Sequence, residues 1–178
     1  MTRRGFLVRA LRAVVAGTAS LPALRAAAAA LATPGTAAGG GLTAAQWAVV
    51  AAVQDHLLPS EPGAPGAREI HGLGYLRLAL DDPKLDPAER ELVCAGVAEL
   101  DTLCRERHAK GFADLDAAQR EAALRRIEQS PTGTAWLAEM LDFLMEALLG
   151  DPSHGGNPGG IGWQWLGVTP GFPRPPLR

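Results

Sequence analysis

The segment from Trp136 to Leu149 constrains the fold of this chain more than any other. Its only polar residues are Glu139, Asp142 and Glu146, and their spacing by three and four places them in one narrow stripe on a helix. A helix that is apolar around most of its circumference must be buried on most sides. Either this helix is the centre of a helical bundle, or a partner protein covers part of it; we favour the first arrangement.

The rest of the chain contains several sequence signals that mark the starts of helices. Thr43 with Gln46, and Asp116 with Gln119, match the capping box, in which each side chain bonds a free backbone N–H at the helix start. Asp86 before a proline is a further N-cap signal, and Ser130-Pro131 is another. The sequence predicts five helices, over residues 44–58, 67–80, 87–108, 117–129 and 131–149.

Apolar spacing predicts which side of each helix faces inward. The predicted inward positions are Trp47, Val50, Ala51 and Leu57 or Leu58 in the first helix, Ile70, Leu73, Leu76 and Leu80 in the second, and Leu92, Gly96, Leu100 and Leu103 in the third. No segment alternates with the period of two that a strand requires. We therefore predict an all-α fold: an irregular bundle of about five helices with a Pro-rich loop at residues 59–66 and a Gly/Trp-rich C-terminal tail.

The N-terminus has the pattern of a twin-arginine export signal, with Arg3 and Arg4 followed by Phe6 and Leu7. Such a signal is read by a receptor and directs folded proteins out of the cytoplasm. A basic segment lying on a membrane or a nucleic acid is the alternative interpretation. The longest uncharged run, residues 13–24, is shorter than the roughly 20 residues that a membrane span needs.

Charge is distributed unevenly along the chain. Residues 1–32 hold five arginines and no acidic residue, so the remainder has 12 of the 17 basic residues against all 19 acidic ones, a formal net charge of −7. An acidic body argues against a nucleic-acid partner. We predict a signal peptide over 1–32, a linker over 33–42, one helical domain over 43–178, and a periplasmic location.

The two cysteines, Cys94 and Cys104, lie ten residues apart in the third predicted helix. That separation is about 15 Å along a helix axis, whereas a disulfide needs Cα atoms within about 7 Å. Cys104 is expected in the core, and Cys94 faces either solvent or a second surface. An exposed thiol in an exported protein indicates an intermolecular bridge, so Cys94 is a candidate for one.

The C-terminal tail is rich in glycine and carries Trp163 and Trp165. Such a segment either packs on its own helices or anchors a partner through the large aromatic side chains. It is not a phosphate loop, because it lacks the Gly-Lys-Ser/Thr ending. Among the four histidines, His154 in this tail is the one that merits a functional test.

The tail and the exit of the first helix resemble a known family over about residues 43–173. The matching residues are Asp151-Pro152, Gly155-Gly156-Asn157, Gly162-Trp163 and Leu166-Gly167 in the tail, and Leu57-Leu58-Pro59 with Pro62-Gly63-Ala64 in the loop. This pattern is similar to that of the gluconate 2-dehydrogenase subunit 3 family. His154 departs from it, since the family often has Tyr before the Gly-Gly pair.

The resemblance implies an accessory subunit of a membrane-associated sugar or sugar-acid dehydrogenase complex. In such complexes a large FAD-dependent subunit of the glucose-methanol-choline type oxidises the substrate, and a multihaem cytochrome c subunit carries electrons towards quinone. The small subunit carries the export signal for the large one. The resemblance thus implies no catalytic residue, cofactor or metal in this chain, and attachment to the inner membrane only through the complex.

Two functions from different classes follow. In the first, the chain is a non-catalytic export escort that binds its partner through Asn157, Trp163 and Trp165, with the loop around Pro59 and Pro62 as the second candidate surface. In the second, it is a stand-alone periplasmic helical enzyme or small-ligand-binding protein. The sequence favours the first, because no nucleophile-elbow, zinc or flavin-binding pattern is present.

Overall fold

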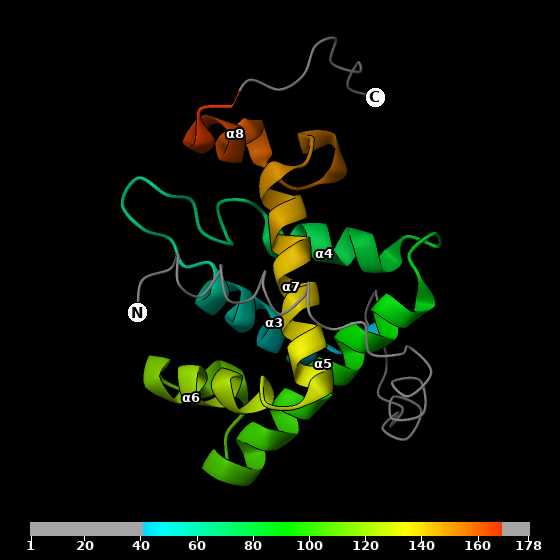
Figure 1. The fold of residues 1–178 in the computed structure, drawn as a ribbon, viewed down its shortest axis with the longest axis vertical. Coiled ribbons are helices and arrows are strands. Elements are labelled where there is room, and N and C mark those ends of the chain that lie inside the picture. The colour runs from blue at the N-terminus through cyan, green and yellow to red at the C-terminus, as the bar shows by residue number, and fades with distance from the viewer. Residues whose placement is uncertain (1–40, 169–178) are drawn as a thin grey trace. The chain divides into compact units, whose positions relative to one another are not determined.

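The computed structural model describes residues 41–168, shown in Figure 1. Its six α-helices are α3 (Ala44–Leu57), α4 (Gly72–Asp81), α5 (Pro87–His108), α6 (Ala117–Ile127), α7 (Pro131–Leu149) and α8 (Ile161–Leu166). Three short 3-10 turns are η2 (Phe112–Asp114), η3 (Pro152–His154) and η4 (Pro158–Gly160). No β-strand occurs among these residues, so the all-α prediction is confirmed. Arg3, Arg4, Phe6 and Leu7 lie outside the described residues.

The predicted helix starts are confirmed by their hydrogen bonds. Thr43 Oγ1 accepts from the Gln46 backbone N–H at 3.3 Å, and the Thr43 N–H donates to Gln46 Oε1 at 2.9 Å. The Asp116–Gln119 capping box is formed in the same way, at 2.8 and 3.2 Å. Because these signals are local, the first residues of α3, α5, α6 and α7 agree with the prediction.

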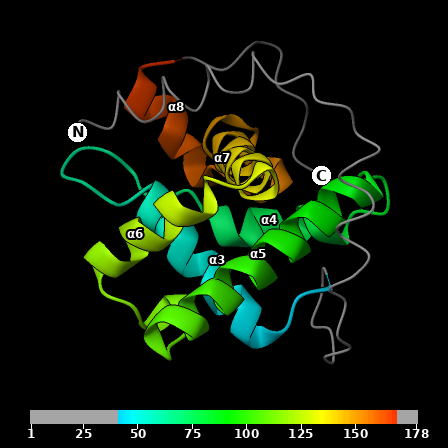
Figure 2. The same ribbon diagram turned by 60° about the horizontal axis from the view of Figure 1, so that its bottom comes forward.

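Helix α7 is the centre of the bundle, as Figures 1 and 2 show. It packs against α5, α4 and α3, and α8 contacts its end. Trp136, Met140 and Leu144 of α7 are completely buried. The interpretation of this apolar helix as a central one is confirmed. Helices α5 and α7 pack closely at Gly96, where an added Cβ would lie 2.1 Å from Trp136 Cγ.

The buried apolar side chains form two clusters. The larger one joins α3, α4, α5, α6 and most of α7, with Phe112 of η2 inside it. The smaller one surrounds the C-terminal part of α7, where Leu144 and Leu148 pack with Ala67 and Ile70 from the segment before α4. Ile161 of α8 packs on this second cluster. The tail is therefore attached to the bundle at the end of α7.

Several predicted details are wrong. The buried face of α5 is rotated by about one position from the prediction: Val93 and Val97 are fully buried beside Gly96 and Leu100, while Leu92 and Leu103 are half-buried against the core. In α3, Val49, Ala52, Val53 and Gln54 are buried in addition to Trp47 and Val50, and Ala51 is only half-buried.

The second helix begins at Gly72 and not at Ala67. His71 adopts the left-handed conformation, with φ 58°, which interrupts the helical backbone, and the Ala67 carbonyl accepts instead from the Gly72 N–H at 2.8 Å. The tail is also more regular than predicted, because α8 follows the two 3-10 turns. Helix α7 is consequently not the last helix.

Candidate functional site

Asn157 organises the C-terminal tail from inside the protein. Its Nδ2 donates to the Gly150 carbonyl at 2.9 Å, and its Oδ1 accepts from the Gly162 N–H at 2.7 Å. Its own backbone N–H donates to the Ile70 carbonyl at 3.0 Å. One residue therefore links the end of α7, the start of α8 and the segment before α4. Because Asn157 is 0% exposed, its side chain stabilises the tail and is not itself presented to a partner.

The two tail tryptophans have different surroundings. Trp163 is half-buried, and its Nε1 donates to the Leu149 carbonyl at 2.7 Å, which covers the C-terminal end of α7. Trp165 is 44% exposed, next to Leu166 at 47%, and Val168 is 53% exposed. Leu149, with 46% of its surface exposed, is the last residue of α7, the helix that α8 contacts. We call Leu149, Trp165, Leu166 and Val168 the tail surface.

The Pro-rich loop is exposed but held in one conformation. Pro59 and Pro62 are on the surface, and the Ala67 N–H donates to the Leu58 carbonyl at 2.8 Å to close the loop. Ser60 Oγ donates to the Glu69 carboxylate at 2.6 Å, and this bond is the main reason why the pKa of Glu69 is lowered. Both the base of this loop and α8 pack on the smaller core cluster. The two predicted interface segments thus lie at one end of the protein.

Cys94 is half-buried on α5, against the larger core cluster. Burial raises the pKa of its thiol, nearby Arg90 lowers it, and Glu91 raises it further. A raised pKa leaves less of the reactive thiolate at neutral pH. Cys104 is fully buried as predicted, and neither cysteine is in a disulfide. An intermolecular bridge through Cys94 stays a prediction, now for a partly covered thiol of reduced reactivity.

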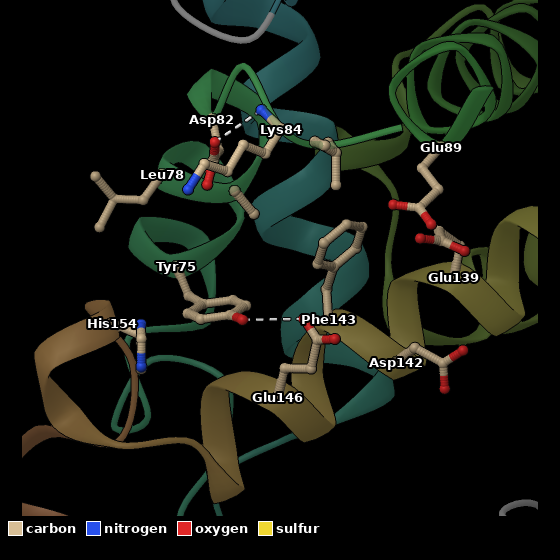
Figure 3. Close-up of a pocket in the computed structure, with 12 residues that line it drawn as sticks. Tyr75, Leu78, Asp82, Lys84, Glu89, Glu139, Asp142, Phe143, Glu146 and His154 are labelled. Carbon is tan, nitrogen blue, oxygen red and sulfur yellow. Dashed lines mark hydrogen bonds between the residues drawn. The ribbon is translucent and has the colours of Figure 1, made fainter. Parts of the chain in front are cut away.

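An acidic cleft lies between α4, the start of α5 and α7, as Figure 3 shows. It encloses about 560 Å³. Glu89 of α5 and Glu139 of α7 point towards each other, and Tyr75 of α4 donates its hydroxyl proton to Glu146 Oε2 at 3.0 Å. His154 of η3 lies beyond Tyr75, so the cleft is the place where the structure puts the histidine that the sequence singled out.

The crowding of carboxylates changes the protonation of the cleft. The pKa of Glu139 is raised to about 7, first by burial and then by the negative charges of Glu89, Asp142 and Glu146. The pKa of Tyr75 is raised to about 12, first by burial and then by its hydrogen bond to Glu146. Near neutral pH, Glu139 therefore exchanges a proton while Tyr75 stays protonated.

Chemically, this cleft can accept hydrogen bonds and favour a positive charge. The described residues hold no group of three or more His, Cys, Asp and Glu side chains that could hold a metal ion. The sequence showed the stripe of Glu139, Asp142 and Glu146, but only tertiary packing adds Glu89 and Tyr75 from other helices.

Within residues 41–168, no helix is both long and apolar enough to cross a membrane.

Replacing Glu139 by glutamine is expected to raise the melting temperature at pH 8 and to leave it unchanged at pH 4. Below about pH 4.5, this residue is protonated in both the folded and the unfolded chain. Between that pH and 7, the unfolded chain loses the proton first, so the free energy of unfolding falls as pH rises. Because Glu139 is partly exposed, solvent screening reduces the effect to about 1 kcal/mol.

Thermal melts of the wild type and the variant at the two pH values measure this difference. Glu106→Gln is the matched control, since Glu106 is exposed on α5 and outside the cleft. An equal stabilisation by Glu139→Gln at both pH values would contradict the assigned charge repulsion.

Together, the fold and the site define a class: small all-α proteins whose Gly/Trp tail docks on their own bundle and leaves an apolar surface exposed. A family model described as gluconate 2-dehydrogenase subunit 3 matches residues 44–171. The chain belongs to this family, as the tail pattern predicted. Comparison with curated proteins and with solved structures gives no match. The family supplies one subunit of a multi-subunit dehydrogenase, so the chain works with partner chains.

Proposed function

We propose that this chain is the non-catalytic small subunit of a periplasmic, membrane-associated sugar or sugar-acid dehydrogenase of the gluconate or glucose type. It assembles with a large FAD-dependent flavoprotein of the glucose-methanol-choline type, and it provides the twin-arginine signal that exports both. The observation that carries the proposal is the family match over residues 44–171. A multihaem cytochrome c subunit completes the complex and attaches it to the inner membrane.

The described part of the chain supports an accessory role. Rossmann-type domains hold a dinucleotide at the carboxyl ends of parallel strands, and residues 41–168 contain no such sheet. The tail surface exposes three large apolar side chains in and just after α8, and a fourth, Leu149, at the end of α7, which α8 contacts. Large aromatic residues at such surfaces anchor protein partners. We therefore place the partner interface at Trp165 and its neighbours, with the loop at Pro59 and Pro62 beside it.

Trp165→Ala is expected to weaken binding of the flavoprotein subunit about 30-fold, the loss typical of one aromatic anchor, while the melting temperature of the chain changes little. Its side chain is 44% exposed, so truncation removes partner contacts and few internal ones. Co-expression, affinity purification and a titration of the purified subunits measure the effect. Glu106→Ala, at an exposed α5 position, is the control. Full binding by Trp165→Ala would remove the tail surface from the interface.

The acidic cleft favours one competing function, that of a stand-alone periplasmic enzyme or small-ligand-binding protein. Its Glu139, with a pKa of about 7, is placed for proton transfer near neutral pH. The purified chain alone would then turn over a substrate or bind a small molecule, and Glu139→Gln would abolish that activity. Recovery of a complex whose flavin and activity reside in the large subunit supports the accessory role instead.

A further inference from the structure

A second surface hollow lies between α3 and α4, on the other side of Leu78 from the acidic cleft. This groove encloses about 650 Å³ and is lined mainly by small and apolar residues, among them Ala51, Leu73, Gly74 and Leu78. Leu78, which is 59% exposed, lines both hollows and forms the ridge between them. We call this hollow the Gly74 groove.

Neither the backbone conformation nor the packing of the described residues requires a glycine at position 74. Gly74 is an exposed residue in the first turn of α4, and glycine is less favourable than alanine in a helix. All other glycines among residues 41–168 either have a positive φ or would bring a Cβ within 3.4 Å of another atom. Gly74 has neither property, since a Cβ there would meet nothing within 4 Å. Its missing side chain leaves the groove open, which suits close approach by another backbone.

The lining of the groove also offers polar contacts. Gln54 of α3 is only 1% exposed, and its Nε2 donates to the Gly72 carbonyl at 3.4 Å. A side-chain amide has two donor hydrogens and an acceptor oxygen, so this single long bond leaves capacity for a further partner. An apolar hollow with a few such polar groups is the usual composition of a binding site.

Arginines lie at the rim of the groove, although the chain is acidic. Seven of the 17 basic residues lie outside residues 41–168, whereas all 19 acidic residues lie inside. The Gly74 groove nevertheless has two arginines, Arg68 and Arg77, against the single carboxylate of Asp55, so one positive charge is in excess there. Arg68 pairs with Asp55, and the Arg77 guanidinium lies over the Trp47 ring, 4.9 Å from its centroid. These contacts hold the two arginines at the rim.

We propose that the Gly74 groove receives a segment of the catalytic partner subunit that presents an apolar side chain next to a carboxylate. The apolar side chain fills the space over Gly74, and the carboxylate binds Arg77 at the rim. A second copy of this chain does not fit, because a two-fold contact through this groove would face arginine against arginine. The proposal rests on the proposed function, since it specifies where the partner of that complex binds.

The test is Gly74→Leu in the full chain, co-expressed with the flavoprotein subunit. The added side chain enters empty space, so the melting temperature should not fall, while binding of the flavoprotein weakens at least about ten-fold, or 1.4 kcal/mol. Ala118→Leu, at an exposed position of α6 outside the groove, is the matched control and should bind normally. Arg77→Gln should weaken binding and reduce its dependence on salt.

Unchanged binding by both Gly74→Leu and Arg77→Gln, in a complex that the wild type forms, would overturn the docking proposal and leave the proposed function intact. Failure of the wild type to bind the flavoprotein would overturn both. If Gly74→Leu lowers the melting temperature, the test rests on Arg77→Gln. Normal binding of the flavoprotein by a folded Arg77→Gln variant would then contradict docking at the Gly74 groove.

Discussion

Gly96→Ala is expected to lower the free energy of unfolding by about 3 kcal/mol and the melting temperature by about 10 °C. The new Cβ would lie 2.1, 2.3 and 2.4 Å from Trp136 Cγ, Cδ1 and Cδ2. Trp136 is completely buried at the centre of the bundle, so its ring cannot move without displacing other core residues. Steric overlap therefore outweighs the gain of about 1 kcal/mol that alanine brings to a helix interior.

Gly74→Ala is the matched control, because it makes the same substitution inside a helix where a Cβ meets nothing within 4 Å. It is expected to stabilise the protein by about 0.5–1 kcal/mol. Chemical denaturation of both variants measures the difference. Equal effects at the two positions would show that α5 and α7 do not approach as closely at Gly96 as described.

Asn157→Ala is expected to cost about 3 kcal/mol and to detach α8 from the bundle. The substitution leaves the Gly150 carbonyl and the Gly162 N–H without the bonds at 2.9 and 2.7 Å that the amide provides. A buried polar group without a partner costs about 1–3 kcal/mol. Alanine must in addition adopt the left-handed φ of 48°, at a cost of about 1 kcal/mol.

Asn157→Gly separates the two contributions, since glycine adopts a positive φ freely but makes neither side-chain bond. The free energy of unfolding of Asn157→Gly should be about 1 kcal/mol higher than that of Asn157→Ala. Hydrogen exchange at the Gly162 amide and the fluorescence of Trp163 report whether the tail stays docked. An Asn157→Ala variant with unchanged exchange at Gly162 would contradict the role given to Asn157.

How much of this fold the sequence could predict depends on how local each signal is. Thr43, Asp86, Asp116 and Ser130 cap their helices through neighbours within three residues, and all four starts are confirmed. By contrast, α8 depends on Asn157, whose partners are contributed by Gly150 and Ile70. Contacts between residues so far apart in the sequence cannot be predicted from a local sequence pattern.

The buried face of α5 shows a second kind of limit. Two overlapping apolar sets, one through Leu92 and one through Val93, have equally good helical spacing. The choice between them is made by α7, because Trp136 packs directly on Gly96 and turns Val93 and Val97 into the core. The candidate sites have the same property, since both hollows combine residues of separate helices.

In the proposed function, Arg3 and Arg4 direct the export of two proteins. The most direct measurement is the location of the flavoprotein subunit in cells that carry Arg3→Lys/Arg4→Lys, determined by fractionation and immunodetection. Arg9→Lys/Arg12→Lys is the control, because it keeps the arginine pair. We expect Arg3→Lys/Arg4→Lys to retain both the small subunit and the flavoprotein in the cytoplasm, whereas the control exports both. A flavoprotein that reaches the periplasm without the arginine pair would contradict this proposal.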